Sequence, residues 1–473
     1  MQGMLKQDKP IRVRMAPSPT GEYHIGHIRT VLYNWAFAKK HNGSFIIRIE
    51  DTDRTRYVEG AIDRILDVIT DYGFTWEEGP RVGGKYGPYI QSERLPLYRK
   101  YALELVEKKA AYYCFCTSER LEQMREEQKS KGIIAAKYDK KCLSLSRDEI
   151  EKNLAEGKEY VIRLDVPANR VITFEDVVFG KISVNTNDID DQILLKSDGF
   201  PTYHLGVVVD DHLMEISHVM RGNDWIPSTP KHILLYEAFG WEPPVYIHLP
   251  NLKELGAFKK LSKRYGPVSA KEFLDEGYLP EALDNFLMLL GWSPGDDREV
   301  YTLDEFVEVF DIKKIHKTDL VSFDRQKLLW MNGSYIQNMP TEKLLNTLKR
   351  FYKNDTEVIG VLESEKGLIL LELAKTRMKT LKDFRSFVIP EEIVLTDVEK
   401  NVAKIMKDKL EKTTQWNKEI ILEVIREIIK QEKIKGSLLY KIFTGREQGL
   451  PLPESLELFG KEESIKKLEK VLQ

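Results

Sequence analysis

The sequence predicts an α/β fold in which a doubly wound parallel sheet is interrupted by an α/β insertion and followed by an all-helical C-terminal region. Strand-like and helix-like segments alternate over residues 12–73, and strand-like segments return at MEISHVM and VYIHL. After Pro340 one helix-type pattern follows another, which predicts the helical region.

The first two strands and helices are defined by their apolar spacing. The alternating segment RVRM at residues 12–15 leads through a Pro/Gly turn into a helix whose apolar face consists of Ile28, Val31, Leu32, Trp35 and Ala36. The apolar strand at residues 45–49 ends at Glu50, and a second helix, with Ile62, Ile65, Leu66 and Ile69, stops near Gly73. Parallel sheets of this kind bind ligands at the carboxyl ends of their strands. We therefore expect four polar residues to be neighbours there: Arg14, Ser18, His24 and Glu50.

Two histidines fall where the first helix begins. His24 and His27 follow the turn directly. A helix N-terminus offers unpaired N–H groups and a partial positive charge, which suit a phosphate group. The sequence therefore predicts a nucleotide site at this helix start, and the alternative is an ordinary surface or core role for both imidazoles.

Length and composition limit the class of protein. A chain of 473 residues suggests roughly three or more folding units of about 150 residues. The net charge of −3 means that a nucleic acid would be held by local basic patches. We find neither a long apolar run nor a signal peptide, and three cysteines do not suggest a disulfide framework. We expect a soluble cytoplasmic protein without a membrane segment.

Four ordered motifs resemble one enzyme family. His24-Ile25-Gly26-His27 resembles the HIGH signature of class I aminoacyl-tRNA synthetases, and the flanking APSPTG and RIEDTDR resemble the glutamate-specific branch. The string at residues 260–264, KLSKR, is similar to the second signature, KMSKS, and the block at 202–225 resembles the amino-acid and adenosine pocket. Because these motifs occur in family order, the chain is identified as a member of the bacterial-type glutamyl-tRNA synthetases, with a Rossmann-like catalytic domain.

The resemblance implies roles in nucleotide chemistry. His24 and His27 would stabilise the α-phosphate of ATP, which is used with Mg²⁺, and Lys263 would neutralise the leaving pyrophosphate from a basic loop. Loss of Lys263 should cost roughly 3 kcal/mol of transition-state stabilisation. The alternative is a solvated basic loop. The residues implied to bind ATP are His24, Gly26, His27, Asp224, Trp225, Leu252, Lys260 and Lys263.

The glutamate pocket needs cations for two carboxylates and an anion for the amine. Arg14 and Arg221 are candidate carboxylate binders because a guanidinium matches a carboxylate bidentately, and Glu50 is placed for the ammonium group. The resemblance implies Arg14 and Tyr203 for the side-chain carboxylate and Arg221 for the α-carboxylate, with Ser18 beside Arg14. Structural salt bridges are the alternative role for the arginines.

Two residues depart from the family pattern. Val207 stands where some members carry an asparagine, and Asn223 stands where an acidic residue is common. Neither residue is among those expected to bind ATP or glutamate. These departures affect the contacts expected within the pocket and do not change the predicted enzyme class.

The segment at residues 93–198 is expected to be an insertion that receives the tRNA acceptor end. Cys114, Cys116 and Cys142 offer three soft ligands for tetrahedral zinc, and the resemblance implies Tyr138 as the fourth. Zn²⁺ would be structural there, and the alternative is three reduced thiols without a metal. Around this insertion we expect four further segments: 1–92 and 199–252 as the halves of the catalytic fold, 253–335 as the basic loop and stem-contact region, and 336–473 as the helical region.

The helical region resembles the anticodon-binding part of bacterial glutamyl enzymes, and we expect it to form two subdomains. Arg377 matches a family arginine linked to discrimination of the last anticodon base, which favours charging of tRNA(Glu) alone. A helical bundle that serves only stability or dimerisation is the alternative. Shortened relatives that glutamylate a modified base lack this region.

The predicted function is that of a glutamate–tRNA ligase that binds L-glutamate, ATP and tRNA(Glu), as a monomer. One alternative is a non-discriminating enzyme that also glutamylates tRNA(Gln). Another is a non-catalytic tRNA-binding protein, which the joint presence of His24, His27 and Lys263 disfavours. A simple nucleotidyltransferase would not need the helical region.

Overall fold

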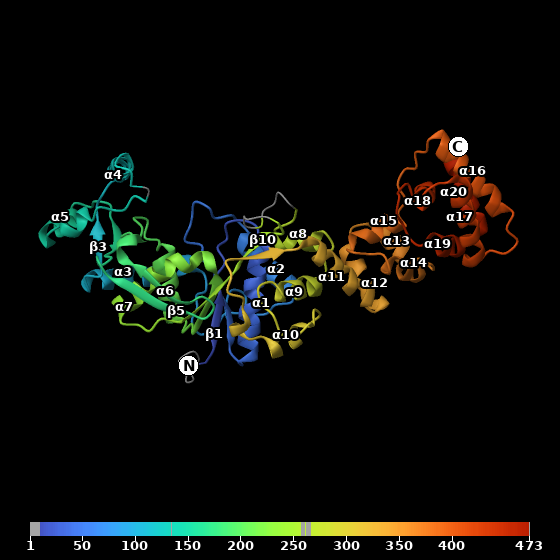
Figure 1. Cartoon of the computed structure of the whole chain (residues 1–473). Helices are drawn as coiled ribbons and strands as arrows, with labels where there is room; N and C mark the ends of the chain where they lie inside the picture. The colour runs from blue at the N-terminus through green and yellow to red at the C-terminus, as the bar shows by residue number, and fades with distance from the viewer. Residues whose placement is uncertain (1–9, 134, 257–260, 262–265, 473) are drawn as a thin grey trace. The chain divides into compact units, whose positions relative to one another are not determined.

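The computed structural model describes residues 10–133, 135–256, 261 and 266–472. The chain forms two compact units, one made of Met1–Lys271 with Asp284–Phe323 and the other of Glu272–Leu283 with Asp324–Gln473. Figure 1 shows the elements of both units in chain order. The first unit is mixed α/β and the second is built from helices.

Parallel strands form the central sheet of the first unit. β1 pairs in parallel with β2, and β8 pairs in parallel with β9. The backbone N–H of Ser217, just before β8, donates to the carbonyl oxygen of Arg12 at 2.9 Å and so links the two pairs. The bounds are β1 (Arg12–Met15), β2 (Ser44–Ile47), β8 (His218–Gly222) and β9 (Val245–Leu249). The predicted parallel α/β fold is confirmed.

The helices of the first unit pack through the apolar stripes that the sequence predicts. In α1 the side chains of Ile28, Val31 and Leu32 are fully buried, and the last turn carries Lys39 and Lys40, which complement the helix dipole. The helices between residues 25 and 309 are α1 (Ile25–Lys40), α2 (Ala61–Asp71), α3 (Leu95–Glu107), α4 (Ser118–Ser130), α5 (Arg147–Ala155), α6 (Tyr203–Leu213), α7 (Thr229–Phe239), α8 (Ala270–Asp275), α9 (Pro280–Met288) and α10 (Leu303–Val309), and α8 and α9 each contain residues of both units.

The inserted segment contributes two different sheets. β3, β4 and β7 form an antiparallel sheet, whereas the β5–β6 hairpin joins β9, so that one sheet has the order β6-β5-β9-β8. The hairpin therefore extends the sheet of the catalytic fold, which its place in the sequence does not reveal. The bounds are β3 (Ala111–Cys114), β4 (Val161–Leu164), β5 (Val171–Asp176), β6 (Gly180–Asn185) and β7 (Ile193–Leu195).

A further strand pair lies beyond β9. β10 (Asn251–Glu254) pairs in parallel with β11 (Leu320–Phe323). The sequence pattern after Gly266 is helical and charged, so the short strand β11 was not predicted. Its four residues are too few to establish a period of their own, and pairing with β10 determines their conformation.

The second unit contains helices packed into two apolar cores. One core includes Leu344, Leu371 and Phe384, and the other includes Met406, Ile421 and Leu468. The helices are α11 (Arg325–Asn338), α12 (Thr341–Phe351), α13 (Thr356–Glu363), α14 (Gly367–Lys375), α15 (Lys382–Val388), α16 (Asp397–Glu411), α17 (Lys418–Glu432), α18 (Gly436–Thr444), α19 (Leu452–Phe459) and α20 (Lys461–Leu472). The division of the helical region into two subdomains stays a prediction, and the structure shows two clusters of buried residues within one compact unit.

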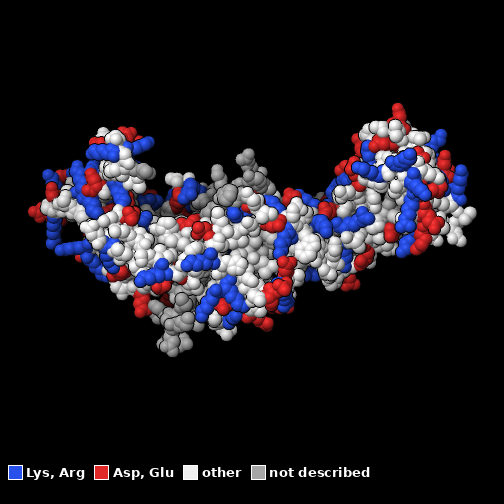
Figure 2. Space-filling view, in the orientation of Figure 1, with Lys and Arg blue, Asp and Glu red and all other residues white. Residues whose placement is uncertain are grey.

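Charged side chains of both signs are interspersed over the face shown in Figure 2. This distribution is in keeping with the net charge of −3. Among the described residues, none of the helices has the length and apolarity that a membrane crossing requires.

Candidate active site

The start of α1 is capped by one of the two signature histidines. His24 is the N-cap residue, and its Nδ1 accepts a hydrogen bond from the backbone N–H of Gly26 at 3.0 Å. Because Nδ1 is an acceptor, the neutral imidazole carries its proton on Nε2 and can donate it to a ligand. A Cβ at Gly26 would lie 3.2 Å from Nδ1 of His24, so glycine leaves room for this cap.

Residues predicted to bind the nucleotide line one cavity. Its volume is about 370 Å³, and it lies where α1 begins and β8 ends. Lys260 and Lys263, predicted to bind ATP and the leaving pyrophosphate, lie outside the described residues. The lining consists of His24, Gly26, His27, Arg29, Thr30, Gly222, Asp224, Trp225, Asn251, Leu252 and Leu261.

Two of the residues predicted to bind glutamate, Tyr203 of α6 and Arg221 of β8, lie beside Trp225 of this cavity. The ring centroids of Tyr203 and Trp225 are 4.3 Å apart, and Nη1 of Arg221 donates to the Tyr203 hydroxyl at 2.9 Å. Trp225 thus connects the residues predicted to bind the nucleotide with those predicted to bind glutamate. Ser18 lies on the exposed turn after β1.

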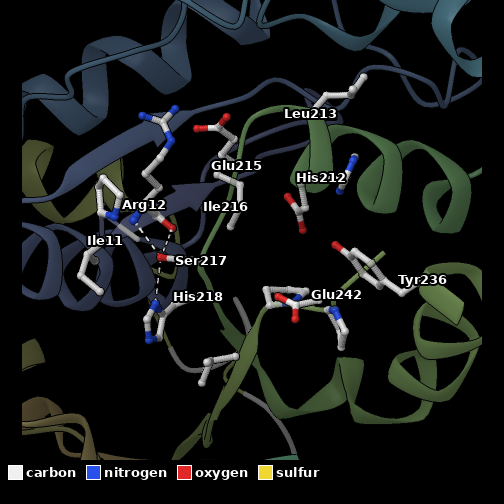
Figure 3. A pocket seen from close by; sticks show the side chains of 15 residues that line it. Ile11, Arg12, His212, Leu213, Glu215, Ile216, Ser217, His218, Tyr236 and Glu242 are labelled. Atoms are coloured by element: carbon white, nitrogen blue, oxygen red, sulfur yellow. Dashed lines mark hydrogen bonds between the residues drawn. The ribbon is translucent and has the colours of Figure 1, made fainter. Parts of the chain in front are cut away.

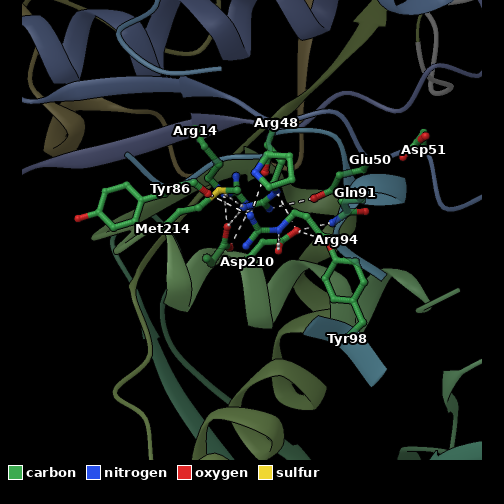
Figure 4. Close-up of polar contacts among 12 residues, drawn as sticks. Arg14, Arg48, Glu50, Asp51, Tyr86, Gln91, Arg94, Tyr98, Asp210 and Met214 are labelled. Atoms are coloured by element: carbon green, nitrogen blue, oxygen red, sulfur yellow. Dashed lines mark hydrogen bonds and ion pairs between the residues drawn. The ribbon is translucent and has the colours of Figure 1, made fainter. Parts of the chain in front are cut away.

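Arg14 and Glu50 are fixed by buried partners, as Figure 4 shows. Nε of Arg14 donates to Asp211 at 3.1 Å, and Nη2 of Arg48 donates to Glu50 at 2.9 Å. Nη1 of Arg48 also donates to Asp211, at 2.8 Å, so Arg48 bridges the two acids. Asp210 joins the same network through an ion pair with Nε of Arg48 at 3.6 Å, and it also accepts hydrogen bonds from Arg94, Tyr98 and Gln91.

The network sets the protonation of its acids. Burial raises the pKa of the Glu50 carboxyl, against the opposing charge of Arg48. For Asp211 burial acts in the same direction, but the charges of Arg14 and Arg48 outweigh it and hold the pKa below its usual value. Asp211 is therefore a stable anion that orients both guanidinium groups.

The two departures from the family pattern have structural explanations. The amide of Asn223 donates to the carbonyl oxygen of Asp319 at 2.9 Å and accepts from Asn251 at 2.6 Å. A carboxylate could not supply the donated bond. Val207 is 1% exposed and packs in the apolar core of the first unit.

The three cysteines converge as predicted, with Tyr138 beside them. Their sulfur atoms all lie within 4.8 Å of one another. The Tyr138 hydroxyl is 3.4 Å from Sγ of Cys114 and 3.2 Å from Sγ of Cys116. Nη1 of Arg120 donates to Sγ of Cys116 at 3.5 Å. Three soft donors and an oxygen in one small cluster fit the donor set of tetrahedral zinc.

A second cavity, of about 570 Å³, lies where strands β1, β8 and β9 begin (Figure 3). Arg12, His218 and Tyr236 are among its lining residues. None of the predicted site residues lines it. Because parallel sheets bind ligands at the other edge, where the strands end, the smaller cavity is the candidate site.

Arg377 lies exposed in the turn after α14. Its guanidinium carbon is 5.7 Å from the ring centroid of Tyr440 in α18, within the range of a cation–π contact. The residue predicted to contact the anticodon therefore lies beside the second helical core.

Several residues that organise the site were not predicted from the sequence. Arg48 and His248 each stand alone as charged or polar residues in the apolar segments FIIRI and VYIHL, and Asp211 comes two residues after the apolar run LGVVV. A charged or polar residue at a buried position requires a partner, and that signal could have identified them. Their partners lie far away in the sequence, so spacing alone could not supply the pairing.

The fold and site define the class of protein. Residues 10–330 match the family described as tRNA synthetases class I (E and Q), catalytic domain, and residues 341–472 match an anticodon binding domain. The protein is a class I aminoacyl-tRNA synthetase.

Similarity over the full length shows to which family of class I synthetases the chain belongs. The chain is 42% identical to the glutamate–tRNA ligases of Clostridioides difficile, over 97% of this chain and 98% of that one, and of Finegoldia magna, over 98% and 99%. A crystal structure of a glutamate–tRNA ligase from Elizabethkingia meningosepticum in complex with its amino acid aligns with a TM-score of 0.81 at 35% identity, over 98% of this chain and 99% of that one. The chain belongs to the glutamate–tRNA ligase family.

Proposed function

We propose that the protein activates L-glutamate with ATP and Mg²⁺ and transfers the glutamyl group to the 3′ end of tRNA(Glu), releasing AMP and pyrophosphate. The observation that carries this proposal is the contact of Trp225, which lines the nucleotide cavity, with Tyr203, whose hydroxyl accepts a hydrogen bond from Arg221. Such a contact would bring a carboxylate next to the α-phosphate of ATP.

Positioning and charge neutralisation are the means of catalysis. Nε2–H of His24 would donate to the α-phosphate while the glutamate α-carboxylate attacks in line and pyrophosphate leaves. His27 would support the same phosphate from the first turn of α1, and Lys263 would neutralise the pyrophosphate. No side-chain nucleophile is needed for this transfer.

The amino-acid pocket has donors left for two carboxylates. Among the described residues, Nη1 of Arg14 has no hydrogen-bond partner, whereas its Nε and Nη2 are held by Asp211. Arg221 directs its Nη1 to Tyr203, and one N–H of that nitrogen remains for a ligand. Arg14 would bind the side-chain carboxylate, Arg221 the α-carboxylate and Glu50 the ammonium group. Glutamine lacks the charge that Arg14 requires.

The other segments take the remaining contacts with tRNA. We assign residues 93–198 to the acceptor end, 253–335 to the loop and stem, and 336–473 to the anticodon, with Arg377 reading its last base. We also propose that the enzyme acts as a monomer in the cytoplasm.

Aminoacylation with separated tRNA(Glu) and tRNA(Gln) tests the proposal. We expect glutamate to be attached to tRNA(Glu), and glutamine to be rejected by orders of magnitude because a buried arginine would lose its partner. Charging of both tRNAs would identify a non-discriminating enzyme. If no amino acid is activated in pyrophosphate exchange, with or without tRNA, the protein is a non-catalytic tRNA-binding relative.

We further propose that Cys114, Cys116, Tyr138 and Cys142 hold one structural Zn²⁺, which would tie the end of β3 to the loop before α5. Metal analysis of the purified protein should find about one zinc per chain. Cys142→Ser should lose the metal, whereas Ser144→Ala, at an exposed neighbouring position, should keep it. A zinc content near zero in the unaltered protein would contradict the assignment.

A further inference from the structure

A buried chain of hydrogen bonds leads from the inserted segment to the α-carboxylate pocket. Oδ2 of Asp176 is 2.7 Å from Nδ1 of His248, and Nε of Arg221 donates to Nε2 of His248 at 3.1 Å. Arg221 in turn contacts the hydroxyl groups of Tyr203 and Thr229, at 2.9 and 2.8 Å. Asp176 and His248 are 1% and 0% exposed, so water does not compete for these bonds.

The donors and acceptors along this chain permit one arrangement. The guanidinium of Arg221 can only donate, so Nε2 of His248 must be the acceptor and Nδ1 must carry the proton. That proton is donated to Asp176, which holds the imidazole in this tautomer. Burial lowers the pKa of His248, in agreement with a neutral ring next to a cation.

Asp176 is itself fixed by its surroundings. Its Oδ1 accepts from the backbone N–H groups of Val178 and Phe179, at 3.0 and 2.9 Å, and its Oδ2 also accepts from the backbone N–H of His248 at 3.1 Å. Three backbone donors and one imidazole thus satisfy a carboxylate that has no direct partner among the described Lys and Arg side chains. Such a carboxylate is a rigid anchor.

The anchor belongs to a segment outside the nucleotide fold. Asp176 is the last residue of β5, and the pairing of β5 with β9 is registered between Asp176 and Tyr246. The backbone N–H of Val177 also donates to the carbonyl oxygen of Tyr246, at 3.0 Å. The β5–β6 hairpin is therefore joined to β9 at the same point where its carboxylate reaches His248.

We propose that Asp176 and His248 are positioning residues for glutamate: they orient Arg221, so that the inserted segment helps to build the α-carboxylate pocket. This proposal rests on the proposed function, because it takes Arg221 as the ligand of that carboxylate. Neither residue touches the substrate. Their loss should therefore affect ligands that carry an α-carboxylate and spare the nucleotide site.

Four variants test the proposal. Asp176→Asn favours the wrong tautomer of His248, and His248→Leu removes the acceptor of Arg221 altogether. His248→Gln keeps an amide that can accept one hydrogen bond and donate another. The matched control is His218→Gln on the same sheet, where a 2% exposed histidine bonds Ser217 and lies at the opposite end of β8 from Arg221.

The measurements are the dissociation constants of L-glutamate, of L-glutamol, which has CH₂OH in place of the α-carboxylate, and of ATP. For Asp176→Asn and His248→Leu we expect glutamate to bind about 10²-fold more weakly, since small displacements of a binding group have effects of this size. Binding of glutamol and ATP should stay within about threefold. His248→Gln should recover most of the affinity for glutamate, and His218→Gln should keep all of it.

These measurements distinguish a wrong positioning role from a loss of the fold and from a wrong proposed function. If Asp176→Asn and His248→Leu bind glutamate as well as the unaltered protein does, or lose glutamol as strongly as glutamate, the positioning role is wrong. Thermal unfolding of each variant identifies loss of the fold, and in that case His248→Gln provides the comparison. If the unaltered protein does not bind glutamate at all, the proposed function itself fails.

Discussion

At the scale of single residues, the candidate site depends on polar groups within apolar segments. Arg48 is fully buried directly after β2, and it contacts Glu50 and Asp211. Burying an isolated charge is costly, so each of these groups is stable only while its partners remain. The buried network therefore links the stability of the first unit to the orientation of Arg14 and Glu50.

Substitution of Asp211 should affect both properties. Asp211→Asn leaves Arg14 and Arg48 without their shared anion, so the free energy of unfolding should fall by about 3 kcal/mol. The KM for glutamate should rise because Arg14 loses its orientation. Urea unfolding and initial-rate kinetics measure the two effects. The control is Asp67→Asn, which breaks an exposed ion pair with Arg81 and should change stability by less than about 1 kcal/mol.

The Asp211 prediction also has a pH signature. A carboxyl group whose pKa is lower in the folded state stabilises the fold above its unfolded pKa, and this contribution disappears as pH falls through the folded pKa. The stability difference between Asp211→Asn and the unaltered protein should therefore be constant near neutral pH and shrink below about pH 4. A difference that grows in acid would contradict the ionic role.

At the scale of elements, the helices and strands that could be predicted are those whose own apolar residues recur at a regular spacing. α1 and α2 were recognised from apolar stripes, and the strands before them from short apolar runs. β11 and the union of β5 with β9 were not predicted, because pairing with a distant strand determines both. The same reason applies to the site: Arg14, Glu50 and Arg221 were found at strand ends, whereas Asp211, Asp176 and His248 act through contacts that only the folded chain creates.

The N-terminus of α1 combines a structural and a chemical role in His24, and two variants can separate them. His24→Asn keeps an N-cap acceptor but loses the Nε2 donor, so stability should be retained while kcat falls about 10²–10³-fold. His24→Ala should lose the same activity and, in addition, about 1 kcal/mol of stability. Thermal unfolding and pyrophosphate exchange provide the two measurements. Full activity in His24→Asn would exclude a phosphate contact from this imidazole.

At the scale of the whole molecule, histidines distinguish the two units. All nine lie within residues 1–271 and 284–323, and the second unit has none. Burial lowers the pKa of His204 to about 3 and that of His218 to about 4, and it lowers the pKa of His232 and His248 as well. These side chains stay neutral in the folded protein at pH values where the unfolded chain is protonated.

The two units should therefore respond differently to mild acid. Below about pH 6.5 the unfolded chain binds more protons than the folded first unit, so each such histidine lowers stability by up to about 1.4 kcal/mol per pH unit. The second unit lacks this term, and its carboxylates matter only at lower pH. Hydrogen exchange at pH 7.5 and 5.0, corrected for intrinsic rates, should show protection falling in β8 and β9 while α16–α20 keep theirs. His218→Gln should reduce the pH dependence of hydrogen-exchange protection in the first unit. An equal loss of protection in both units would mean that the buried histidines do not control the acid sensitivity of the first unit.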